Sequence, residues 1–227
     1  MYFYLSLVAG IIAAIVFLIV RVKKGGVAGL LAKTTASVLF IITSFAALKD
    51  NPNGYEWFTY VALGLIFGMI GDIVLDLKVI YTESSDAYLF SGMAAFTIGH
   101  IFFIVGMGVK YGIHWAVPVV AILVGATAVL IGPKLKLDYG KFKIPAALYG
   151  ITLAFTACMS GYVMVITEFA TAYVIMFVGS VFFLISDLVL STMYFGKDKN
   201  TPTNVIINHA TYYIAQLLIA STVFFIL

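Results

Sequence analysis

The sequence predicts an all-α, polytopic membrane protein with eight transmembrane helices, and three observations carry this prediction. Of the 227 residues, 63% are hydrophobic and only 10% are charged, and the mean hydropathy is +1.11, far outside the values of soluble domains. The apolar residues form continuous runs instead of alternating, which favours helices over a barrel. The runs occupy nearly the whole chain, so we expect a single transmembrane bundle domain over residues 1–227, with its function inside the bundle.

A window of about 20 residues, the length that crosses the hydrocarbon as a helix, predicts eight segments. The first has no basic residue before it and has Arg21, Lys23 and Lys24 after it, so we expect it to be retained and not cleaved as a signal peptide. The segments cover residues 2–22, 26–48, 56–77, 86–109, 114–132, 144–166, 170–194 and 203–227.

Basic residues are divided unequally between the two sets of loops. The second, fourth and sixth loops hold only Lys49 and Lys110. This bias predicts that both termini are extracytoplasmic, in the plasma (inner) membrane if the source is a bacterium. The small net charge of +3 therefore reports topology, and we expect no nucleic-acid partner. The other four loops hold Arg21, Lys23, Lys24, Lys78, Lys134, Lys136, Lys141, Lys143, Lys197 and Lys199.

Three charged residues lie at one depth inside the predicted helices. At about 1.5 Å of rise per residue, Asp72 lies about 8 Å inside the cytoplasmic end of its helix, and Lys33 and Asp187 lie about 10 Å inside theirs. A charge near the bilayer centre costs from about 2.5 kcal/mol upward, so such residues usually face a bundle interior and pair with one another. Further polar residues at this level are Tyr149, Asn208, His209, Tyr212, Tyr213 and Gln216.

These residues predict a polar pocket that opens toward the cytoplasmic leaflet. Its carboxylates outnumber its lysine, and unequal surroundings let one such site hold both an acid and a base. A structural ion pair with Lys33, or an interhelical hydrogen bond, is the alternative for Asp72 and Asp187. Asp76 lies only about 2 Å from the predicted end of its helix, so we expect it to be interfacial and solvated.

Other polar residues have a structural reading beside the functional one. His100, in FTIGHIFFIVG, is as consistent with a structural hydrogen bond as with proton transfer. The Tyr212 and Tyr213 pair is equally consistent with pocket lining and with helix packing. His114 is expected in an outer loop, and the first and fifth helices, which have almost no polar interior residues, are expected to face lipid or to pack.

The third and seventh segments resemble each other. FGMIGDIVLD and FFLISDLVLS align Asp72 with Asp187, 115 residues apart, and His100 and His209 follow in the next helices, 109 residues apart. The match predicts two parallel four-helix repeats related by an axis along the membrane normal, with the two aspartates facing each other across a cleft.

Five stretches, in order along the eight predicted helices, resemble the YhhN, or lysoplasmalogenase, family of integral membrane proteins. One position differs: Thr34 follows Lys33 where a proline is associated with the family, which bears on the local shape of the second helix. The stretches are the Lys33 segment, GDIVLD at Asp72, FSGMAAFTIGHIFF from Phe90 to Phe103, LISDLVLS at Asp187 and TYYIAQLLI from Thr211 to Ile219.

The resemblance implies a membrane-embedded hydrolase that cleaves the vinyl ether bond of lysoplasmalogens to a fatty aldehyde and a glycerophospho-headgroup. In this hypothesis the catalytic acid and base are Asp72 and Asp187, in either order, because the reaction needs a proton donor, an anion and a base for water. Lys33 neutralises or orients them, or contacts the substrate phosphate. Tyr213, Gln216 and His209 hydrogen-bond water and glycerol, and the remaining supporting residues are Asp76, His100, Tyr149, Asn208 and Tyr212.

The expected partners are a lysophospholipid substrate and membrane lipids, with no prediction of oligomeric state. No metal or other cofactor is predicted, because the three histidines lie at unlike depths; a divalent cation bound by carboxylates stays open as an alternative. A small proton-coupled transporter is the rival function, although the polar groups lie near one face only. A non-catalytic lipid-binding protein explains a cavity but not the acid pair.

Overall fold

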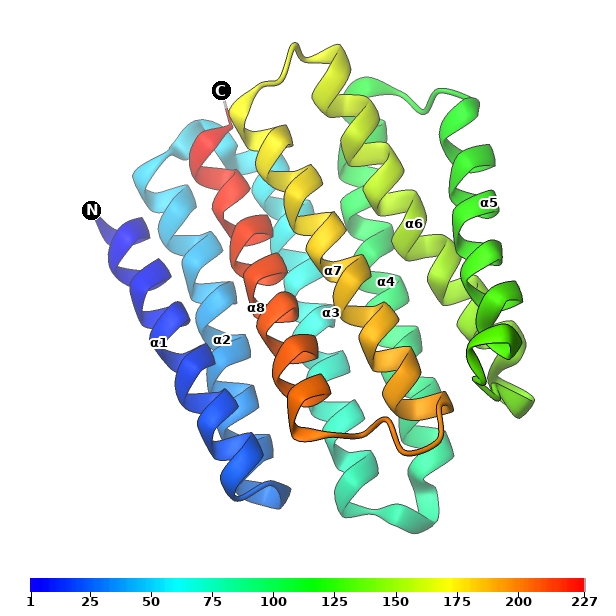
Figure 1. Cartoon of the computed structure of the whole chain (residues 1–227). Helices are drawn as coiled ribbons and strands as arrows, with labels where there is room; N and C mark the ends of the chain where they lie inside the picture. The colour runs from blue at the N-terminus through cyan, green and yellow to red at the C-terminus, as the bar shows by residue number, and fades with distance from the viewer. Residues whose placement is uncertain (227) are drawn as a thin grey trace.

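The computed structural model describes residues 1–226, which form eight α-helices connected by short loops and 3-10 turns (Figure 1). No strand forms within these residues, and an isolated antiparallel bridge joins Leu137 to Gly196. The helices are α1 (Tyr2–Lys23), α2 (Gly26–Asp50), α3 (Tyr55–Ile80), α4 (Ser85–Tyr111), α5 (Ala116–Ile131), α6 (Lys143–Ile166), α7 (Thr171–Phe195) and α8 (Pro202–Phe225).

The predicted all-helical architecture is confirmed, with each predicted segment appearing as one helix. In the described part of the chain, seven helices, α1 to α7, are long and apolar enough to cross a membrane. Most ends differ from the prediction by one or two residues, and α3 continues three residues further, to Ile80. Helix α5 begins only at Ala116, so exposed His114 lies in the loop before it. The eighth segment was predicted to end at residue 227, which lies outside the described residues.

Successive helices run antiparallel, so both described ends of the chain lie at the same end of the bundle (Figure 1). Side chains at the end of α2 hold them there. The ammonium group of Met1 is 2.5 Å from Asp50 Oδ2, and the Asn51 side-chain amide donates to the backbone carbonyls of Phe224 and Ile226 at 3.0 and 2.8 Å.

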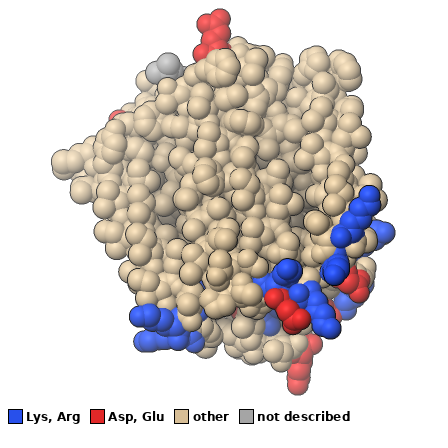
Figure 2. Space-filling view, in the orientation of Figure 1, with Lys and Arg blue, Asp and Glu red and all other residues tan. Residues whose placement is uncertain are grey.

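Lysine and arginine side chains gather at the opposite end, where the α1–α2, α3–α4, α5–α6 and α7–α8 loops lie (Figure 2). We call this the basic end. The basic residues that the sequence assigns to these four loops therefore lie together at one end of the bundle. Which end faces the cytoplasm stays a prediction.

Helices α1 and α5 expose large apolar side chains on the outer surface of the bundle. The large side chains of Leu5, Ile12 and Leu123 are each more than half exposed, which an apolar helix tolerates in lipid but not in water. By contrast, α8 packs against α1, α2, α3 and α7 and buries polar residues among them, including Asn208 and Gln216. This packing places the polar face of α8 inside the bundle.

Candidate active site

A cavity of about 310 Å³ lies near the basic end, where α1, α2, α3, α7 and α8 meet, with Phe96 of α4 also in its wall; we call it the polar cavity. Residues of the α1–α2 and α7–α8 loops, such as Gly25 and Asn200, form its outer rim. Asp72 and Asp187 both line it, so the shared hollow that the sequence predicts between them is present. Its other charged or titratable lining residues are Arg21, Lys33, Asp76, Tyr194, His209 and Tyr212.

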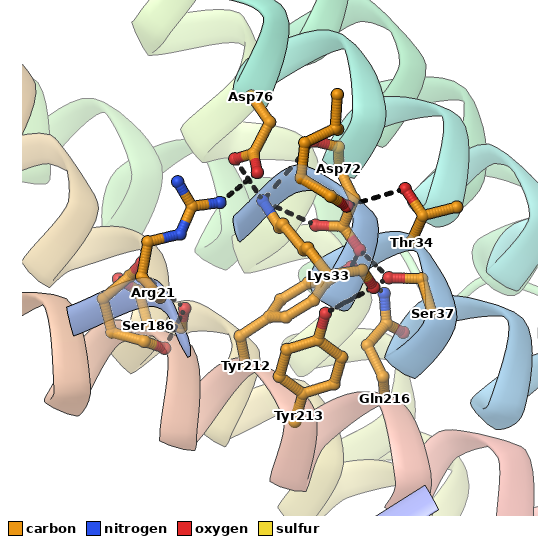
Figure 3. Close-up of polar contacts among 12 residues, drawn as sticks. Arg21, Lys33, Thr34, Ser37, Asp72, Asp76, Ser186, Tyr212, Tyr213 and Gln216 are labelled. Carbon is orange, nitrogen blue, oxygen red and sulfur yellow. Dashed lines mark hydrogen bonds and ion pairs between the residues drawn. The ribbon is translucent and has the colours of Figure 1, made fainter. Parts of the chain in front are cut away.

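Asp72 on α3 is buried and fully surrounded by partners. The residue is only 1% exposed. The ammonium nitrogen of Lys33 on α2 lies 3.1 Å from Asp72 Oδ1. The hydroxyls of Ser37 and Tyr212 each donate to Oδ2 at 2.6 Å. A buried carboxylate is tolerated when a cation and hydrogen-bond donors replace its water. These contacts therefore suit an ionised Asp72 (Figure 3).

Opposite charges alternate along the cavity wall from Arg21 to Asp72 (Figure 3). The Arg21 guanidinium, at the end of α1, forms an ion pair with Asp76 Oδ2, and Lys33 Nζ is 3.4 Å from Asp76 Oδ1. Asp76 is only 7% exposed, so the expectation of a solvated Asp76 is wrong. Two causes explain the error: α3 extends beyond the predicted end, and Arg21 folds back over the carboxylate.

Two tyrosines of α8 have different tasks. Tyr212 lines the polar cavity and contacts Asp72, whereas the Tyr213 hydroxyl donates to the backbone carbonyl of Lys33 at 3.1 Å and lies 3.3 Å from Ser37 Oγ. Gln216 lies one turn beyond and donates to the Tyr212 hydroxyl at 2.9 Å. Tyr213 and Gln216 thus position α2 and Tyr212, and neither lines the cavity.

Asp187 on α7 differs from Asp72 in its partners. Its Oδ2 is buried and has no hydrogen-bond partner, and no ion pair reaches its carboxyl group within residues 1–226. The residue is half-buried and lines a second, apolar cavity together with Tyr149. The site therefore holds one carboxyl group beside a cation and one without.

Of the remaining predicted residues, Asn208 and His209 line the polar cavity and His100 does not. Asn208 clamps α8 to α7, since its side-chain amide donates to the Ser186 backbone carbonyl and hydroxyl, both at 2.9 Å. His209 lines the polar cavity, with its ring 5.0 Å from that of Phe17. His100 lines neither cavity: it is buried, and its Nδ1 lies 2.9 Å from the Thr156 hydroxyl. The structural hydrogen bond weighed for His100 is thus present, between α4 and α6.

Sequence reasoning missed two residues of this network. Arg21 was counted as a loop charge that sets topology, although it also pairs with Asp76. Ser37 stands four residues after Lys33, on the same helix face, and that spacing could have identified it. Within residues 1–226 no three His, Cys, Asp or Glu side chains gather in a way that could hold a metal ion.

The family model described as the YhhN family matches residues 28–223, which include Lys33, both aspartates and the polar face of α8. The chain belongs to the YhhN family. No curated protein and no solved structure gives a significant match. Arg21 lies outside the stretch that the family model matches.

Thr34, the position that departs from the pattern associated with the YhhN family, leaves α2 regular. The helix is continuous over Gly26–Asp50, and the Thr34 hydroxyl donates to the Leu30 carbonyl one turn back at 2.9 Å. A proline at this position would remove that turn's backbone hydrogen bond and bend the helix. Lys33 reaches Asp72 here from an unbroken helix.

Proposed function

We propose that this YhhN-family protein hydrolyses the vinyl ether bond of lysoplasmalogens, releasing a fatty aldehyde and a glycerophospho-headgroup. The observation that carries the proposal is that Asp72 and Asp187 line one cavity in unlike surroundings. Family membership and the apolar bundle agree with a membrane lipid as substrate.

The reaction consumes one water and needs three contributions from the protein. An acid protonates the alkene carbon that is not bonded to oxygen, which leaves an oxocarbenium ion on the carbon bonded to the ether oxygen. Water adds to that carbon and loses a proton to a base, and the resulting hemiacetal collapses to the aldehyde and the glycerol hydroxyl. An anion beside the cation lowers the barrier, as it does in glycosidases.

We assign the acid to Asp187 and the stabilising anion to Asp72. A buried carboxylate without a cation is costly, so Asp187, which has no ion pair among the described residues, is suited to carry a proton and deliver it to the alkene. After delivery it is a carboxylate and can take the proton of the attacking water. Asp72 stays ionised throughout because Lys33, Ser37 and Tyr212 satisfy its charge.

The cationic side of the polar cavity suits the substrate headgroup. The Arg21 and Lys33 side chains line the cavity near the loops of the basic end, and His209 lies on the α8 side. We propose that the phosphate lies near Arg21 and Lys33, and that His209 hydrogen-bonds the glycerol backbone or water. Tyr213 and Gln216 act as positioning residues, because their polar groups already contact α2 and Tyr212.

We also propose that α8 crosses the bilayer with the other seven helices, because it packs between α2 and α7 over its length (Figure 1). The basic end then faces the cytoplasm, with both termini outside. The helix contacts support a four-helix duplication as well: α1–α2, α2–α3, α3–α4 and α2–α8 contacts correspond to α5–α6, α6–α7, α7–α8 and α6–α4 contacts.

The test uses purified protein in detergent and a lysoplasmenyl ethanolamine lipid, with released aldehyde as the readout. Asp72→Asn and Asp187→Asn should each abolish release. The matched control is Asp86→Asn, because Asp86 is exposed at the basic end and pairs only with exposed Lys141. Size-exclusion profiles and thermal unfolding check that each variant is folded.

Two outcomes would contradict the proposal. Full turnover in both aspartate variants would remove the acid and base roles. Proton flux in liposomes without aldehyde release from any lysoplasmenyl lipid would favour the transporter instead.

A further inference from the structure

A second cavity, of about 140 Å³, lies between α5 and α6 on one side and α3, α4 and α7 on the other. We call it the apolar cavity. Aliphatic side chains from four of these helices make most of its wall, among them Met93, Val129, Leu153 and Leu184. Of its lining residues only Asp187 is an acid, and none is basic.

The two cavities meet at α7. Asp187, Leu190 and Tyr194 of α7 line both, as do Leu75 of α3 and Phe96 of α4. Asp187 therefore stands at the junction, with a polar compartment of paired charges on one side and a hydrocarbon-like one on the other. Its unpartnered, buried Oδ2 is a polar atom that the fold itself leaves unsatisfied.

Two residues that line the apolar cavity also reach the outer surface of the bundle, one on α5 and one on α7. They are Val124 and Leu188, which are 43% and 49% exposed. At the basic end the α5–α6 loop closes it, since the Tyr139 hydroxyl lies 3.0 Å from Ser191 Oγ and the Asp138 backbone amide donates to the Phe195 carbonyl at 2.8 Å. A hydrocarbon chain can therefore enter the apolar cavity sideways from the lipid, while the α5–α6 loop covers the end of the cavity that faces water.

We infer that the apolar cavity receives the single hydrocarbon chain of a lysolipid, so that the bond to be cleaved lies beside Asp187 and the headgroup occupies the polar cavity. The inference rests on the proposed function and adds the orientation and chain specificity of the substrate. The match in chemistry supports it: a lysolipid is one charged head on one apolar chain, and the cavities offer one compartment for each. The released aldehyde leaves sideways into the bilayer.

Gly150 on α6 determines how much chain fits. It lines the apolar cavity, and a Cβ added there would meet only the Gly125 carbonyl oxygen, at 3.7 Å, so a side chain would extend into free space. Gly125, which faces it from α5, is different because a Cβ there would lie 2.5 Å from the Ile151 backbone. Of these two glycines, only Gly150 can therefore be enlarged without separating α5 from α6.

The test measures kcat/KM for aldehyde release with lysoplasmenyl lipids of increasing chain length. Gly150→Leu should lower kcat/KM at least about tenfold for long chains and much less for short ones, since a few methylenes in an apolar pocket discriminate by this order. Ala128→Leu, which fills the same cavity from α5, should act in the same direction. Thr127→Leu is the control, because it places a leucine at an exposed position of α5 outside both cavities.

A binding arm separates failure of the inference from failure of the proposed function. It measures binding of a labelled 1-alkyl lysophosphoethanolamine, whose saturated ether has no alkene to protonate. Chain-length-dependent binding that Gly150→Leu weakens supports the inference even if no lipid is hydrolysed. Equal loss at every chain length in both filled variants, or no change in either, overturns it.

Discussion

The polar and the apolar cavity are built from corresponding helices and have opposite chemistry. If α1–α4 are aligned with α5–α8, the helices α1, α2, α3, α7 and α8 around the first correspond to α5, α6, α7, α3 and α4 around the second. Phe96 of α4, which also lines the polar cavity, has no counterpart from α8 in the lining of the apolar cavity. Asp72 and Asp187 hold corresponding places. One faces Lys33 from α2, whereas the other has Tyr149 from α6 in its cavity.

The same contrast recurs one turn further along α3 and α7. Asp76 aligns with Ser191 in the repeated motif; Asp76 pairs with Arg21, and Ser191 lies 3.0 Å from the Tyr139 hydroxyl. In both places a side chain from elsewhere in the chain closes the basic end, once by charge and once by a neutral contact. The comparison teaches that one helix framework can hold two carboxyl groups in different ionisation environments, which is what an acid and a counter-ion need.

The largest effect is expected when Lys33, the cation that pairs with Asp72, is removed from the polar cavity. Lys33→Met leaves Asp72 without an ion-pair partner and Asp76 with only one, so we expect it to abolish aldehyde release and to destabilise the protein by about 3–5 kcal/mol. Thermal and denaturant unfolding in detergent measure the second effect. Lys33→Arg serves as the control that keeps the charge. A fully stable Lys33→Met variant would contradict an ionised Asp72.

A smaller effect is expected when the Tyr212 hydroxyl, which donates from α8 to Asp72, is removed. Tyr212→Phe removes one donor to a charged, buried group, which is worth about 1.5–3 kcal/mol, and kcat should fall about 10- to 100-fold. Tyr213→Phe is the paired control, because its hydroxyl bonds a backbone carbonyl instead of the carboxylate. Steady-state aldehyde release compares the two. Equal losses in both variants would make Tyr212 a packing residue only.

The smallest effect should come from His100, which belongs to neither cavity. His100→Gln keeps a polar group beside Thr156 and should change stability by about 1 kcal/mol or less, with kcat/KM within about twofold of the native value. A large loss of activity with unchanged unfolding would show that a proton passes through this histidine after all. The two measurements together decide between its structural and functional readings.

The sequence located the two aspartates because a charged residue in an apolar run is rare and repeats in GDIVLD and LISDLVLS. It did not reveal Arg21 as a partner of Asp76, because a basic residue after a first helix is explained equally well by topology. It misjudged Asp76 because hydropathy places helix ends only to within a few residues, and three more residues of α3 moved this carboxylate into the bundle.

The sequence by itself determined the number and type of the helices, the alternation that places the four basic loops together, and the common level of Lys33, Asp72 and Asp187, because hydrophobic length and rise per residue fix these quantities within each segment. The tertiary structure decided which carboxyl group receives a cation. The partners of Asp72 come from 35 to 140 residues away along the chain, and only helix packing sets how each helix is rotated toward its neighbours. That rotation turns Lys33 and Tyr212 toward Asp72 and leaves Asp187 without a cation, between the polar and the apolar cavity.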